Sequence, residues 1–70
     1  MDSSTQHLLE DSYMETVEEA LSAGHPEDTA HSEGITAAAM MLASMEGMED
    51  AVARATVDGL SFHPQMLDDS

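Results

Sequence analysis

Acidic side chains are the residues of this chain whose type and spacing could do chemistry, and they gather in two groups. Each group places three carboxylates at positions i, i+3 and i+4. The two triplets are Glu15, Glu18 and Glu19, and Glu46, Glu49 and Asp50. On a helix, side chains at these positions share one face at about 5–6 Å, a spacing that can imitate nucleic-acid phosphates. We therefore predict that these six residues bind a basic, nucleic-acid-binding surface of a protein partner.

The charge of the whole chain agrees with an electrostatic role. Its 70 residues include 15 acidic ones and a single cation, Arg54, so the formal net charge is −14. We expect Arg54 to pair with Asp50 or Asp58, each one helical turn away. The remaining acidity argues against free nucleic acid and anionic membranes as partners. Adaptation to a high-salt cytosol would favour the same acidity, and the composition does not separate the two explanations.

A metal site is the alternative from another functional class. Asp28 and His31 stand at i and i+3, and Glu18 would face His31 in a hairpin that turns near residue 24. Carboxylate-bridged di-iron bundles use such elements in pairs, so a second chain would have to supply the other half. Without a metal, we expect His31 to be hydrogen-bonded to Glu18. Two further pairs offer soft-metal ligands, Met45 with Met48 and His63 with Met66.

Catalysis finds no support in the residues. The chain has no cysteine nucleophile, no lysine, no glycine-rich phosphate loop and no G-x-S-x-G elbow. We predict a non-enzymatic protein that needs no cofactor. Very small acidic helical proteins of this kind are common among phage and mobile-element inhibitors, including DNA mimics and anti-restriction or anti-CRISPR proteins. The analogy is one of size and charge.

Helix start and stop signals predict an all-α fold that positions these groups. Ser3 with Gln6 has the capping-box form, and an apolar row then recurs at i, i+4, i+8 and i+12. This row is Leu9, Tyr13, Val17 and Leu21. Gly24 is a natural left-handed C-cap, and Pro26 suits the first position of a new helix. Stop and start signals this close together predict a tight helical hairpin.

The second helical segment is rich in alanine and methionine. Its main apolar stripe is Ile35, Ala38, Leu42, Met45 and Val52. One unbroken helix from Pro26 to Asp58 would leave its outer half uncovered unless a second copy packed on it. We favour a break at Gly47 over one at Gly34. The break at Gly47 gives a three-helix bundle. The expected helices span about 4–23, 26–46 and 48–58.

The chain length and its two ends complete the expectations. Chains under about 70–80 residues rarely build a strong core, so we expect a homodimer formed through the Ala/Met stripe. Gly59 ends the last helix, which makes 1–59 one helical domain and 60–70 a tail. The tail's apolar residues Leu60, Phe62 and Leu67 are expected to fold back, with the last three residues frayed. No signal segment or bilayer-spanning apolar run is present, which favours a cytoplasmic protein.

Overall fold

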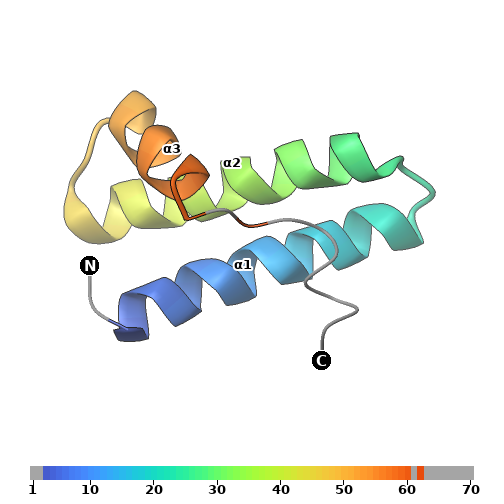
Figure 1. The fold of residues 1–70 in the computed structure, drawn as a ribbon, viewed down its shortest axis with the longest axis horizontal. Coiled ribbons are helices and arrows are strands. Elements are labelled where there is room, and N and C mark those ends of the chain that lie inside the picture. The colour runs from blue at the N-terminus through green and yellow to red at the C-terminus, as the bar shows by residue number, and fades with distance from the viewer. Residues whose placement is uncertain (1–2, 61, 63–70) are drawn as a thin grey trace.

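The computed structural model describes residues 3–60 and residue 62, and this part of the chain is all-α. It contains three helices, α1 (Ser3–Ser22), α2 (Glu27–Glu46) and α3 (Asp50–Asp58), and no strand. α1 and α2 form an antiparallel hairpin, and α3 turns back over the C-terminal half of α2 (Figure 1). None of these three helices combines the length and the hydropathy needed to cross a membrane. The predicted all-α fold with three helices is confirmed.

Gly24 sets the turn of the hairpin. Its φ of +94° is left-handed, a conformation that glycine adopts without strain. The His25 N–H then donates to the Ala20 carbonyl at 3.0 Å, which is the hydrogen bond of a Schellman motif. The predicted cap at Gly24 is confirmed. Pro26, with ψ of 161°, is the N-cap of α2 and not its first helical residue, so α2 begins one residue later than predicted, at Glu27.

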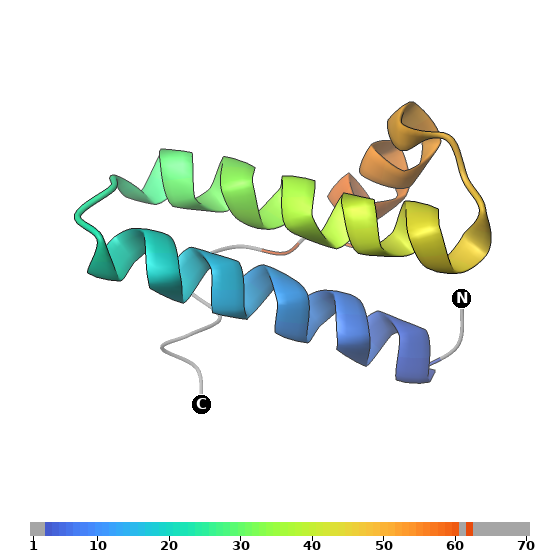
Figure 2. The same cartoon turned by 180° about the vertical axis from the view of Figure 1, so that it is seen from behind.

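Gly47 ends α2 by the same device and separates it from α3. Its φ is +66°, and the Met48 N–H donates to the Ala43 carbonyl at 3.1 Å. The predicted break at Gly47 is therefore confirmed, and the alternative of one long helix is wrong. The predicted apolar stripe is wrong beyond Leu42, because Met45 at its end and Val52 after the break are exposed. Figure 2 shows from behind how the chain reverses between α2 and α3.

The outer helix ends differ from the predictions in detail. α1 already includes Ser3, so Ser3 does not stand in front of the helix as an N-cap. Gly59 follows the end of α3 as predicted, but its φ of −69° is right-handed. The Gly59 N–H still donates to the Ala55 carbonyl at 3.1 Å, so the helical hydrogen-bond pattern continues through it. Gly59 therefore marks the end of the helix without a left-handed cap.

The core lies between α1 and α2 and is completed by α3 and Phe62. The buried apolar residues are Leu9, Tyr13, Val17, Ala20, Ala30, Ile35, Ala38, Ala39, Leu42, Ala53, Val57 and Phe62. The ring centroids of Phe62 and Tyr13 are 5.2 Å apart, and Leu60 packs against the core. Leu60 and Phe62, two of the three tail residues expected to fold back, therefore lie against the core. Leu67 and the last three residues lie outside the described part of the chain.

Candidate functional site

α1 carries four of its five acidic side chains opposite its buried side. The row Leu9, Tyr13 and Val17 is fully buried, and residues about half a turn away from it point outward. Four exposed carboxylates occupy that outward side: Asp11, Glu15, Glu18 and Glu19. We call these four residues the α1 acidic face. It extends over about 12 Å of helix axis at 1.5 Å per residue.

The α1 acidic face is larger than the predicted triplet. The triplet Glu15, Glu18 and Glu19 shares one exposed side of one helix, as its spacing predicts. Asp11, which was not among the predicted residues, joins the triplet at i−4 from Glu15, and that spacing was the available signal. α1 contains neither lysine nor arginine, so no cation on the same helix offsets these charges.

The second predicted triplet is not a helical face. Glu46 is the last residue of α2, Glu49 is the N-cap of α3, and Asp50 is its first residue. The spacing i, i+3, i+4 aligns side chains only within a continuous helix, and Gly47 interrupts this one. All three carboxylates are exposed. Two of them lie at the N-terminus of α3, where the helix dipole favours negative charge, so a local structural reason accounts for their position.

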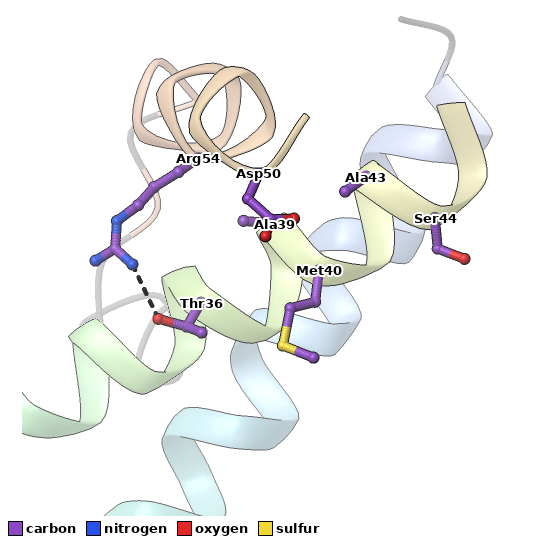
Figure 3. A pocket seen from close by; sticks show the side chains of 7 residues that line it. All are labelled: Thr36, Ala39, Met40, Ala43, Ser44, Asp50 and Arg54. Atoms are coloured by element: carbon purple, nitrogen blue, oxygen red, sulfur yellow. Dashed lines mark hydrogen bonds between the residues drawn. The ribbon is translucent and has the colours of Figure 1, made fainter. Parts of the chain in front are cut away.

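A groove of about 600 Å³ lies between α2 and α3 (Figure 3). Arg54, the single Lys or Arg residue of the sequence, lies at this groove. The groove is lined by Thr36, Ala39, Met40, Ala43, Ser44, Asp50 and Arg54. Nη1 of Arg54 donates to Oγ1 of Thr36 at 3.0 Å, and the Thr36 hydroxyl donates to the Ser32 carbonyl at 2.9 Å. The predicted pairing of Arg54 within α3 is replaced by this bond because the fold brings α2 within reach of the guanidinium.

His31 belongs to the Tyr13 environment. The Tyr13 hydroxyl and Nδ1 of His31 are hydrogen-bonded at 2.7 Å, and the two rings meet edge to face with centroids 5.6 Å apart. The predicted hydrogen bond from His31 to Glu18 is wrong, because Glu18 lies on the outward side of α1 while Tyr13 faces α2. Burial raises the pKa of Tyr13 from 10.0 to about 12 by desolvation of the phenolate.

The predicted metal ligands are not gathered within one chain. Across residues 3–60 and 62, no three His, Asp or Glu side chains lie close enough to hold a metal ion. Glu18, Asp28 and His31 therefore do not form such a group within one chain, and a metal site built from two chains stays a prediction. Of the soft-metal pairs, Met48 packs on the core while Met45 is exposed. His63 and Met66 lie outside the described residues.

Comparison with known proteins does not extend this description. The chain matches no model of a known protein family, no curated protein and no solved structure at a significant level.

Proposed function

We propose that this chain is a non-enzymatic interaction protein that docks through the α1 acidic face on a basic, nucleic-acid-binding surface of a protein partner. Docking would block or modulate the partner's access to nucleic acid. One observation supports the proposal above the others: four exposed carboxylates share one side of a helix that has no cation of its own. The opposite side of α1 is buried against α2, so these charges are presented on an ordered helix.

The physical basis is electrostatic complementarity. A surface of one sign accelerates the encounter with a surface of the other sign and fixes their relative orientation. The net charge of −14 would attract a basic partner from a distance, and the α1 acidic face would provide the contact. A partner that already neutralises phosphates has its lysines and arginines spaced for regularly placed negative charges.

Three further features belong to this proposal. We propose a homodimer, because a chain of this size gains stability from covering its exposed apolar surface. We place the protein in the cytoplasm, where nucleic-acid-binding partners are at hand. We assign it to the type of small inhibitors encoded by phages and mobile elements on the analogy of size and charge.

Neutralising the α1 acidic face is expected to weaken partner binding. The tagged chain would first be used to capture proteins from its host, keeping only a partner that duplex DNA displaces. The variant Glu15→Gln, Glu18→Gln, Glu19→Gln changes the net charge from −14 to −11, since −14 + 3 = −11. We expect the Kd for that purified partner to rise at least about tenfold, or 1.4 kcal/mol. Wild-type affinity should also fall as salt rises from about 0.1 M to about 1 M.

A matched variant separates the face from the net charge. Glu46→Gln, Glu49→Gln, Asp50→Asn makes the same charge change at the segment between α2 and α3. We expect it to weaken binding by less than about threefold. Equal losses in both variants would mean that net charge acts without a specific face. Affinity that is indifferent to both variants and to salt would contradict electrostatic docking and point to the Ala/Met-rich surface.

A further inference from the structure

The outer surface of α2 is an uncharged region on a strongly acidic molecule. Residues 34–45 form the longest stretch of the sequence without Asp, Glu, Lys or Arg. At 1.5 Å per residue it covers about 18 Å of helix, most of the length of α2. Its buried side faces α1 and α3, and the rest faces solvent. The exposed residues of this stretch are Thr36, Met40, Ser44 and Met45.

Met40 stands out within this surface. Its side chain is 66% exposed, the highest value among the exposed large hydrophobic residues. It lines the groove between α2 and α3 together with the small side chains Ala39 and Ala43 (Figure 3). The protruding Met40 side chain and the groove lined by small residues are complementary in shape. In a two-fold dimer, Met40 of each copy can meet the groove of the other copy, so the same contact forms twice.

The charges around the groove favour a second copy of this chain as its occupant. Two chains that each carry −14 repel one another over most of their surfaces, so they can approach closely where charge is absent. At the groove, Asp50 and Arg54 stand one helical turn apart. Under a two-fold operation, each copy offers one acidic and one basic group to the other. A basic partner, by contrast, is attracted to the α1 acidic face, where the exposed carboxylates gather.

We propose that two copies of the chain associate about a two-fold axis through this surface, with Met40 of each copy entering the α2–α3 groove of the other. The homodimer named under the proposed function thereby gains a specific contact surface. The biological role of the dimer rests on the proposed docking function. α1 lies on the side of α2 away from the groove, so the two α1 acidic faces point outward. The dimer is then bivalent for basic partners, which raises its avidity for any partner with two basic surfaces.

Salt distinguishes this contact from partner docking. Raising the ionic strength from 0.1 M to 1 M shortens the Debye length from about 10 Å to about 3 Å, which removes most of the repulsion between two acidic copies. Sedimentation equilibrium of the purified chain should therefore show the mass rising with salt from 7.5 kDa towards 15 kDa, twice the chain mass. Partner binding should weaken over the same range. A mass of 7.5 kDa at 1 M salt and millimolar chain concentration would overturn the dimer.

Charged substitutions locate the contact. Met40→Glu places a carboxylate in the groove of the other copy and is expected to weaken the dimer on the order of 30-fold. Val52→Glu is the matched control, because Val52 is 50% exposed and does not line the groove. Circular dichroism verifies that both variants are folded. Equal weakening by both substitutions, or none by Met40→Glu, would show that the contact lies elsewhere.

Arg54→Gln supplies a second variant that does not depend on Met40. It should weaken the dimer on the order of threefold to tenfold by removing the basic group at the groove. The Glu15, Glu18 and Glu19 variant described above should dimerise at least as well as the wild type. Because all these measurements use the chain alone, failure of the dimer leaves docking by α1 untouched, and failure of docking leaves the dimer untouched.

Discussion

Replacing Gly34 with leucine is expected to leave the chain unfolded. Gly34 lies inside α2 and packs against two fully buried side chains of the α1 core, Tyr13 and Val17. A Cβ atom built on it would lie 2.6 Å from Cδ2 of Tyr13 and 2.8 Å from Cγ2 of Val17. Both partners are fully buried, so neither side chain can move away without disturbing the core. The packing of α1 on α2 therefore requires the absence of a side chain at position 34.

The magnitude follows from the small size of the core. Overpacking a well-packed core costs about 1–3 kcal/mol for small additions, and a chain this short has only about 3–5 kcal/mol of stability. Gly34→Ala gains about 1 kcal/mol of helix propensity against that overpacking cost, so we expect a net loss of up to about 2 kcal/mol. Leucine adds three more carbons at the same point and exceeds what the fold tolerates. Urea unfolding followed by circular dichroism measures both variants.

Gly59→Ala is the matched control for Gly34. A Cβ atom at Gly59 would meet nothing closer than 3.4 Å, and its φ of −69° suits any residue. We expect this variant to be as stable as the wild type or up to about 1 kcal/mol more stable. A Gly34→Ala protein as stable as the Gly59→Ala protein would refute the close contact between α2 and Tyr13.

Alkaline unfolding centred on Tyr13 is the second large effect. The pKa of Tyr13 is raised from 10.0 to about 12 in the folded protein because the phenolate would lose its hydration in the core. The neutral form is thus favoured by folding, and its stabilisation is complete below pH 10. As pH rises from 10 to 12, the unfolded chain ionises first and the folded state loses about 2–3 kcal/mol. That loss is comparable with the whole stability expected of the chain.

The composition of the chain leaves the Tyr13 titration free of overlap with other side chains. The chain has one tyrosine and no lysine or cysteine, so Tyr13 is the side chain that ionises between pH 10 and 12. The rise in phenolate absorbance should coincide with the loss of helical circular dichroism. Tyr13→Phe should remove the dependence of stability on pH in this range. Below pH 10 it should cost about 1 kcal/mol, because the 2.7 Å bond to His31 is lost. Phenolate formation near pH 10 with the helices intact would contradict burial of this ring.

The helices were predictable because their signals are local. Gly24, Gly47 and Gly59 each stand within two residues of a helix end, and the three observed helices lie within two residues of their expected bounds. The apolar row of α1 also predicted its buried side, which in turn leaves Glu15, Glu18 and Glu19 exposed. Such features depend on φ, on hydrogen bonds between near neighbours and on the helical period. The order of residues along the chain specifies all three.

The remaining features depend on how the helices meet, and the tertiary structure decided them. Gly34, a candidate helix break in the sequence, is instead the point of closest contact between α2 and α1. His31 bonds to Tyr13, and Arg54 bonds to Thr36, across 18 residues in each case. Partners this distant are chosen by the register and tilt of one helix on another. A one-dimensional pattern of residue types does not contain that geometry. The sequence thus determined the acidity, the helices and the acidic side of α1, while packing determined the core contacts, the α2–α3 groove and the division of the second acidic triplet.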